Sequence, residues 1–285
     1  MDCRRLTIAC LLRTRITLLG CDARASMSNR VLADARSRLK VSYERRSMHC
    51  PGSHECSAEV LRRMLDRQQG HRGNGLSPTV AYVLAALCTF AGLVVLVRGG
   101  RTSRVDRRVT LALQRQTSPR LARIMRLVSW PGFPPQSRTL PLLFPLALWL
   151  KGCRLEAVFQ LLGWGTSAIS GTIKFLMRRP RPNHPDITVA EARIGGSSFP
   201  SGHVINYIGV YGFLAFLAHR HVKLPVLRRA IVGGVLTMIT LVGPSRIYLG
   251  HHWLSDVLAS YLLGTSYLLT LTAIYRRVKQ WISAP

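Results

Sequence analysis

Two histidines and an acid stand together near the C-terminal end of the sequence, just before a long apolar run. His252 and Asp256 lie four residues apart, so they share one face if the segment from Trp253 onward is helical. The carboxylate would then accept the proton on one imidazole nitrogen and leave the other nitrogen free to attack. We predict that His252 is a nucleophile or general base held by Asp256. His251 pairs at this spacing only with Ser255, a weaker partner.

A second segment carries groups suited to binding an anion. Residues Phe199 to His203 directly precede an apolar stretch, and Ser201 or Gly202 is placed to cap a helix there. The first N–H groups of a helix have no partner within the helix, and they point outward at such a terminus. This start is therefore a predicted anion site.

Cations at two other places complete the set needed for a phosphate. Lys174 and Arg181 lie at the end of another apolar run, and Arg246 precedes the histidines. Together these three would balance the charge of a phosphate, with His203 and His252 on opposite sides of its phosphorus. Taken singly, each residue has a simpler interpretation. His203 would cap a helix, and Lys174 or Arg246 would extend to lipid headgroups.

These segments resemble the signature of the type 2 phosphatidic acid phosphatases (PAP2), which share their site with vanadium-dependent haloperoxidases. That pattern reads Lys, six residues, Arg-Pro; then Pro-Ser-Gly-His; then Ser-Arg, five residues, His, three residues, Asp. All three blocks occur here in that order: Lys174 to Arg181-Pro182, Pro200 to His203, and Ser245-Arg246 to His252 and Asp256. A rival first block ending in Arg179-Pro180 has only four intervening residues and ranks lower. The resemblance covers residues 174–256, and family-like helices extend it to about Pro78.

The resemblance implies a mechanism. His252 would attack phosphorus to form a phospho-histidine, while His203 would protonate the leaving alkoxide and then activate the water that cleaves the intermediate. Asp256 would orient His252 and raise its basicity. The phosphate oxygens would be held by Lys174, Arg181, Ser201, the N–H of Gly202, and Arg246. The resemblance also implies that neither a metal nor another cofactor is required, which fits the lack of a plausible cluster of metal-ligating residues in the sequence.

The composition of the chain indicates an integral membrane protein. Of its 285 residues 48% are hydrophobic, and several apolar runs are long. The formal net charge is +28, but Arg outnumbers Lys about seven to one, as a GC-rich genome would produce. Basic flanks on apolar helices bind anionic lipid headgroups. We therefore predict a bilayer with anionic lipids as the partner, and not nucleic acid.

The apolar runs predict an all-α fold, a six-helix transmembrane bundle of the PAP2/haloperoxidase type. Arg98 to Arg138 is expected to form amphipathic helices on the membrane surface. The expected spans are Pro78 to Val97, Thr139 to Leu150 with a start as early as Ser129, Leu155 to Leu176, Val204 to Ala218, Ala230 to Val242, and Leu254 to Tyr275.

The turns between these spans predict an orientation. With six spans, basic turns at 151–154, 219–229 and 276–279 share one side, which the positive-inside rule marks as cytoplasmic. The predicted location is the bacterial inner membrane, with the active site on the extracytoplasmic face. The arginine-rich connection at 98–138 breaks the rule unless its helices lie on the lipid surface.

Residues 1–77 differ from the rest, which we treat as the phosphatase domain, residues 78–285. The first segment is basic, lacks a helical or strand period, and is expected to be poorly ordered. A lipoprotein-like cleavage site ending at Cys21 and a metal knuckle at Cys50 and Cys56 are less favoured interpretations, and Met27, Met48 or Met64 is an alternative start.

The predicted activity is hydrolysis of a lipid phosphate or diphosphate. Undecaprenyl diphosphate, phosphatidic acid and phosphatidylglycerol phosphate all present a phosphate at the membrane interface, and the sequence does not choose among them. The alternatives are a lipid phosphotransferase using the same phospho-histidine, a vanadate-dependent haloperoxidase-like protein, and a membrane scaffold with a degenerate site. The sequence makes no prediction of oligomeric state.

Overall fold

The computed structural model describes residues 77–116, 118–190 and 195–283, and each regular element in these ranges is a helix. The all-α prediction is confirmed for them. Residues 77 to 285 form one compact unit. Except for Ser77, the predicted basic extension lies outside the described residues, together with its cysteines and alternative start sites.

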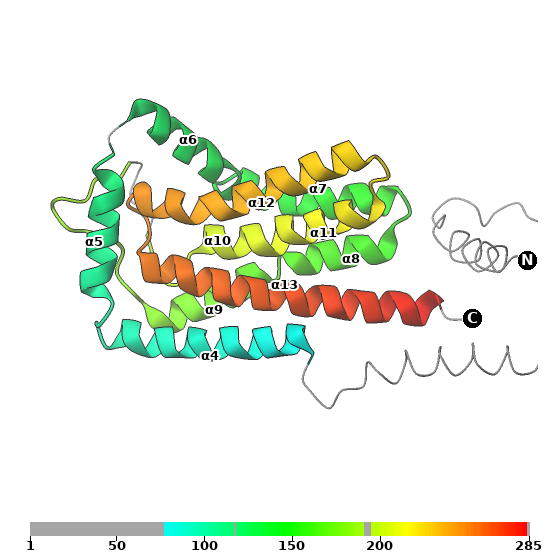
Figure 1. The fold of residues 1–285 in the computed structure, drawn as a ribbon, viewed down its shortest axis with the longest axis horizontal. Helices are drawn as coiled ribbons and strands as arrows, with labels where there is room; N and C mark the ends of the chain where they lie inside the picture. Colours follow the sequence, from blue (N-terminus) through cyan, green and yellow to red (C-terminus); the bar gives the residue numbers. More distant parts are fainter. Residues whose placement is uncertain (1–76, 117, 191–194, 284–285) are drawn as a thin grey trace, which may run out of the picture. The chain divides into compact units, whose positions relative to one another are not determined.

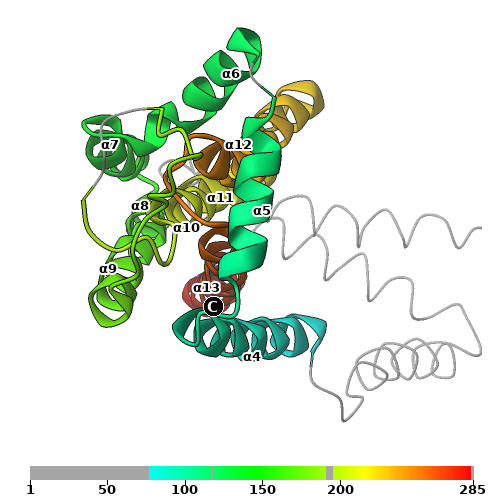
Figure 2. The ribbon, with the colours of Figure 1, turned by 90° about the vertical axis from the view of Figure 1, so that its left-hand side faces the viewer.

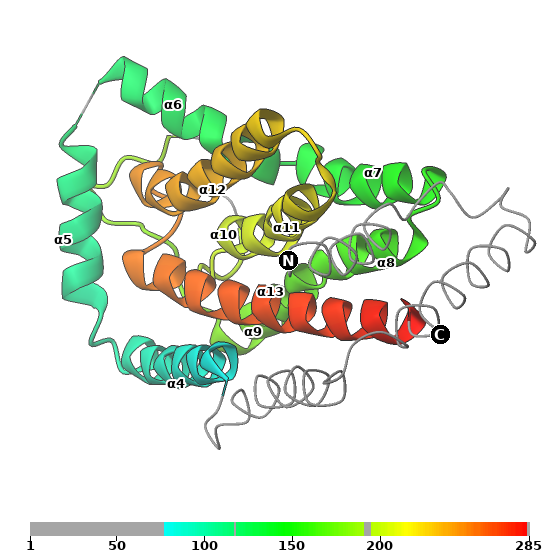
Figure 3. The same cartoon turned by 45° about the vertical axis from the view of Figure 1, so that its right-hand side comes forward.

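Three helices in the described part are long and apolar enough to cross a membrane: α4 (Pro78–Arg98), α12 (Pro225–Tyr248) and α13 (Leu254–Ser283). Both α4 and α12 begin with proline, whose fixed φ suits the first helical position. The side chain of Ser77 accepts a hydrogen bond from the backbone N–H of Val80 and caps α4. Figures 1 and 3 show α4 lying beside α13. The chain is an integral membrane protein.

The helices that run alongside these three are shorter. They are α7 (Gln136–Leu150), α8 (Arg154–Gly163), α9 (Thr166–Met177), and a continuous run of α10 (Gly202–Asn206), the π-helical turn η2 (Tyr207–Tyr211) and α11 (Gly212–His221). The predicted six-helix count is not confirmed, because three helices among the described residues meet the length and hydropathy needed to cross a membrane.

The span expected from Leu155 to Leu176 is two helices that meet at Trp164-Gly165. A Cβ on Gly163 would come within 2.6 Å of the carbonyl oxygen of Gly209, so two backbones touch beside the break. Small residues allow this kind of approach in membrane proteins. The predicted end points also shift: α12 starts at Pro225 instead of Ala230 and continues through Pro244, and α13 extends beyond Tyr275 to Ser283.

The arginine-rich connection forms two helices, α5 (Ser103–Gln114) and α6 (Pro119–Ser129), followed by the short 3-10 turn η1 (Trp130–Gly132). Figure 2 shows α5 crossing the ends of the long helices, near the start of α13. Two of its polar side chains, Asp106 and Thr110, are buried although half of the residues of the helix are exposed. This end of the molecule is where the predicted catalytic segments converge.

Candidate active site

His252 lies in the turn between α12 and α13 and is buried. Its Nδ1 donates a hydrogen bond to the backbone carbonyl of Ser198, with 2.7 Å between the two atoms. A carbonyl can only accept, so Nδ1 carries the proton and Nε2 keeps its lone pair in the neutral ring. Asp256 is farther away, with 3.6 Å between its Oδ2 and Nδ1. The nearest acceptor for His252 is thus a backbone oxygen, and the predicted carboxylate comes second.

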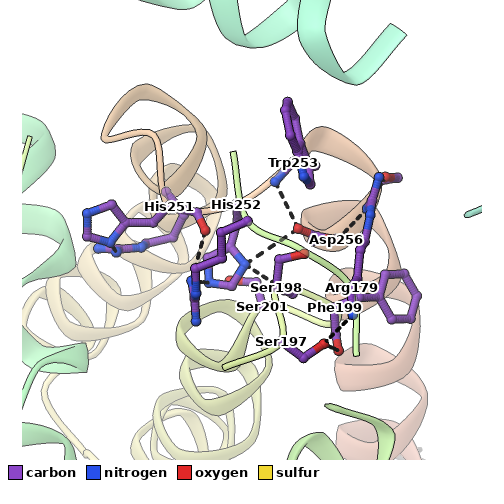
Figure 4. A network of polar contacts seen from close by, with 12 residues as sticks. Arg179, Ser197, Ser198, Phe199, Ser201, His251, His252, Trp253 and Asp256 are labelled. Atoms are coloured by element: carbon purple, nitrogen blue, oxygen red, sulfur yellow. Dashed lines mark hydrogen bonds and ion pairs between the residues drawn. The ribbon is translucent and has the colours of Figure 1, made fainter. Parts of the chain in front are cut away.

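Asp256 performs a second task at the start of α13. Its Oδ2 accepts a hydrogen bond from the backbone N–H of Trp253, three residues earlier, at 2.9 Å. This is the reciprocal half of a capping box, in which the third helical residue reaches back to the cap position. The other oxygen, Oδ1, contacts a guanidinium nitrogen of Arg179 at 2.5 Å. Figure 4 shows Asp256 between Trp253, His252 and Arg179.

The electrostatic surroundings keep His252 neutral. Burial lowers its pKa well below the ordinary histidine value, and the positive charges of Lys174, Arg181 and Arg246 lower it further, while the hydrogen bond to Ser198 opposes them. A neutral imidazole is the form that can attack phosphorus. The arrangement therefore favours the neutral form that the predicted nucleophile requires.

The three predicted cations come from three different elements. Lys174, on α9, donates from Nζ to the carbonyl of Ser197 at 3.0 Å. Arg181 follows α9, and its Nη1 lies 2.9 Å from the backbone oxygen of His251 and 3.4 Å from Nε2 of His252. Arg246, near the end of α12, is fully buried. Arg181 thus lies beside the predicted nucleophile, which favours the Arg181-Pro182 register.

Ser201, Gly202 and His203 form the start of α10. The backbone N–H of Ser201 donates to Oγ of Ser260 on α13 at 2.7 Å, which fixes this start against α13. Within the described part of the chain, Oγ of Ser201 and Nε2 of His203 are buried and have no hydrogen-bond partner. Leaving such a group unpaired costs about 1–3 kcal/mol, so these atoms suit an incoming polar ligand.

A cavity of about 340 Å³ opens beside His203. Its polar lining includes Ser137, Arg138, Ser167 and Asn206, and Trp164, Tyr207, Val210 and Tyr211 are among its larger side chains. A mixed lining of this kind can hold a polar group that continues into an apolar chain.

Several contacts at the site were not predicted from the sequence. The ring of Phe133, just after η1, lies 4.9 Å from both the guanidinium carbon of Arg246 and the ring centre of His203. His251 was assigned no role, yet its Nδ1 contacts Nη2 of Arg246 and its backbone oxygen binds Arg181. Burial, followed by the charges of Arg246 and Arg181, lowers the pKa of His251 to about 3. His251 therefore stays neutral and supports two of the predicted phosphate ligands.

Arg179 was also set aside, and it contacts Asp106 as well as Asp256. One signal in the sequence could have found Asp106, since it is the only acidic residue between Arg98 and Arg138. The Ser198 contact had no such signal, because it uses a backbone atom.

Residues 157–280 match the model of the PAP2 superfamily. This part of the chain is similar to the PAP2 superfamily. This confirms the family that the three sequence blocks indicated, and the matched region contains all of them. Among the described residues, no group of three or more His, Cys, Asp or Glu side chains is placed to hold a metal ion.

Two comparisons with known proteins agree with that assignment. Phosphatidylglycerophosphatase B of Bacillus subtilis (strain 168) is 32% identical over 132 residues, which are 44% of this chain and 61% of that protein. A crystal structure of a transmembrane PAP2-type phosphatidylglycerolphosphate phosphatase from Bacillus subtilis superposes with a TM-score of 0.61 at 22% identity, covering 69% of this chain and 96% of the other. The chain therefore has the fold of that phosphatase. The aligned segment spans less than two thirds of the curated relative.

Proposed function

We propose that this protein is a membrane phosphatase that removes phosphate from a lipid phosphate or diphosphate through a phospho-histidine. The observation that carries the proposal is the state of His252. Its Nδ1 is tied to the carbonyl of Ser198, its Nε2 faces Arg181, and its pKa is lowered so that the ring is neutral. The phosphatase activity named for the Bacillus relative supports the same reaction.

In the proposed reaction, Nε2 of His252 attacks phosphorus and the bond from phosphorus to the leaving oxygen breaks. Charge on the phosphate oxygens is balanced by Lys174, Arg181 and Arg246, aided by the Ser201 hydroxyl and the Gly202 N–H. The bound phosphate brings negative charge to the site, and His203, protonated in its presence, gives that proton to the leaving oxygen. It then takes a proton from water, which attacks phosphorus and releases His252.

The cavity beside His203 supports a lipid as the substrate. In an in-line displacement the leaving oxygen departs on the side opposite His252. His203 is the proposed acid on that side and lines the cavity. The polar lining suits the headgroup part of a lipid, and the aromatic lining suits the start of its chains. Phosphatidylglycerol phosphate, the substrate class in the names of both Bacillus proteins, is the first candidate, followed by phosphatidic acid and undecaprenyl diphosphate.

The extracytoplasmic face of the bacterial inner membrane is the proposed location of the site. The basic turns at 151–154 and 219–229 lie at the end of the helices away from α5, as does the C-terminal end of α13 (Figure 1). The positive-inside rule then supports a cytoplasmic position for that end.

Phosphate release tests the proposal. The detergent-purified protein is given phosphatidylglycerol phosphate, phosphatidic acid and undecaprenyl diphosphate, each with EDTA present. We expect metal-independent release that His252→Ala abolishes and that His219→Ala, a change at an exposed histidine of α11, leaves intact. Glycerol in a parallel reaction would reveal a phosphotransferase by forming glycerol phosphate. Equal release by His252→Ala, or none by the folded wild type on any lipid, would reject the proposal.

A further inference from the structure

Three charged side chains from three separate elements meet at the start of α13, next to His252. Asp106 comes from α5, Arg179 from the loop after α9, and Asp256 from the first turn of α13. The guanidinium of Arg179 bridges the two acids, with Nη1 at 2.5 Å from Oδ1 of Asp256 and Nη2 at 2.7 Å from Oδ2 of Asp106. The side chains of Asp106, Arg179 and Asp256 are 2%, 11% and 0% exposed. At this degree of burial each ion pair matters for stability, because removing one partner would leave a buried charge unpaired at a large cost in folding free energy.

Asp106 also binds the start of α13 directly. Its Oδ1 accepts a hydrogen bond from the backbone N–H of Ser255 at 2.9 Å, and its Oδ2 accepts one from the Ser255 hydroxyl at 2.7 Å. Arg179 adds hydrogen bonds to Ser255 Oγ at 2.7 Å and to Thr102 Oγ1 at 3.2 Å. A carboxylate at a helix N-terminus is favoured by the free N–H groups and the helix dipole. Helix α5 thus supplies a cap for a helix 149 positions later in the chain.

The geometry points to Asp106 and Arg179 as positioning residues for His252, a role that rests on the proposed function. Arg179 holds one oxygen of Asp256, and the other oxygen faces Nδ1 of His252. Arg179 shares its charge with Asp106, so with both acids ionised the cluster of two acids and one arginine carries one net negative charge. That charge is available to stabilise the imidazole when it gains positive character in the transition state.

Arg179 differs from the three cations assigned to phosphate because it pairs with acidic side chains of the protein. Its two terminal nitrogens are occupied by Asp106, Asp256, Ser255 and Thr102. If Asp106 lost its charge, Arg179 would act on Asp256 alone, and the carboxylate would have less negative charge to offer His252. We therefore expect Asp106→Asn to impair the chemical step more than substrate binding.

The test compares variants in detergent by phosphate release and by orthovanadate binding. Orthovanadate readily becomes five-coordinate and so mimics the transition state of phosphoryl transfer, and its affinity is measured by calorimetry without lipid turnover. Asp106→Asn and Arg179→Gln are each expected to lower kcat on the order of 10- to 100-fold with KM within about twofold, since small misplacements at a reacting centre have effects of this size. Both are also expected to weaken vanadate binding. Arg179→Lys, which keeps the charge but loses the fork, should restore part of the rate.

The control variants make the same types of substitution, Arg to Gln and Asp to Asn, at exposed positions. Arg178→Gln changes the neighbouring, exposed arginine, and Asp186→Asn changes an acid whose side chain is 70% exposed. Neither should change kcat or vanadate affinity. Elution volume and melting temperature show which variants are folded, and Arg179→Lys serves as the second test if Asp106→Asn does not fold.

A double-mutant cycle separates positioning from general support. If Asp106 acts through Asp256, then Asp106→Asn should have little further effect on kcat in the Asp256→Asn background. The inference would be overturned if the two substitutions lowered kcat by independent factors that multiply in the double variant. It would also be overturned if folded Asp106→Asn changed only KM or kept the wild-type kcat. A wild type that binds vanadate in an Asp106-dependent way but releases no lipid phosphate would reject the lipid phosphatase alone. A wild type that does neither would reject both.

Discussion

Gly132 lies so close to His203 that a Cβ on Gly132 would come within 2.1 Å of Cδ2 of the imidazole. Gly132→Ala must therefore displace either the ring or the turn that carries Gly132. We expect kcat/KM for phosphate release to fall on the order of 100-fold, because the proposed acid would leave its position. Gly171→Ala on α9 is the control, since a Cβ there meets nothing within 4 Å. Wild-type activity in folded Gly132→Ala would argue against His203 as the acid.

Phe133 offers a test of how Arg246 is held. Its ring lies 4.9 Å from the guanidinium carbon and packs edge-on against His203. Replacing it by leucine keeps an apolar residue but removes the cation–π contact, worth about 0.5–2 kcal/mol. We expect Phe133→Leu to lower kcat/KM about 3- to 30-fold in the same assay. Phe175→Leu removes a comparable contact with exposed Arg178 and should change nothing measurable.

The lowered pKa of His252 predicts an unusual acidic limb in the pH profile. Protonation would remove the nucleophile, so activity should fall only when the pH approaches the lowered pKa. We expect kcat/KM, which reports the free enzyme, to show no loss from His252 as the pH drops through about 6.5, the ordinary histidine value. The substrate phosphate itself titrates near about pH 6 and is followed in parallel by phosphorus NMR. A limb at the ordinary histidine value, after that correction, would contradict a buried neutral His252.

A second buried cluster predicts an effect on stability without one on chemistry. Glu156 of α8 is buried and accepts a hydrogen bond from the Tyr275 hydroxyl at 2.8 Å, and it also pairs with Lys279. Glu156→Gln weakens this link between α8 and α13, with an expected loss of about 1–3 kcal/mol. Thermal unfolding in detergent should show a lower midpoint, while kcat per folded molecule stays at the wild-type value. Tyr275→Phe, which removes one neutral hydrogen bond, should have a smaller effect.

The spacing of charged and small residues along the chain was enough to indicate the family and to bring the right segments together. His252 and Arg181 illustrate this, since they are 71 positions apart and their side chains lie 3.4 Å apart. Asp256 also lies near His252, with 3.6 Å between its Oδ2 and Nδ1, although His252 is in the turn before α13 and not on the helix. The individual roles of these residues remain predictions, because the comparisons do not test them.

Contacts that depend on through-space packing could not be predicted in the same way. The acceptor for His252 is the carbonyl of Ser198, and any residue type could supply it. The sequence did not single out Phe133, because its approach to Arg246 depends on how the chain folds after η1. The break between α8 and α9 was missed for a similar reason. Glycine and serine in an apolar run indicate close helix packing, but they do not say where two backbones touch.

The groups proposed to touch phosphate come from chain segments at one end of the helices, whereas the outward surfaces of α4 and α12 are largely exposed and apolar. Amino-acid substitutions in these two parts of the molecule are constrained differently during evolution. One end must keep a few side chains around the same small anion, while the sides need only remain compatible with lipid tails. A descendant could replace most of that lateral surface, and with it the preferred membrane or acyl chain, while its chemistry stayed unchanged.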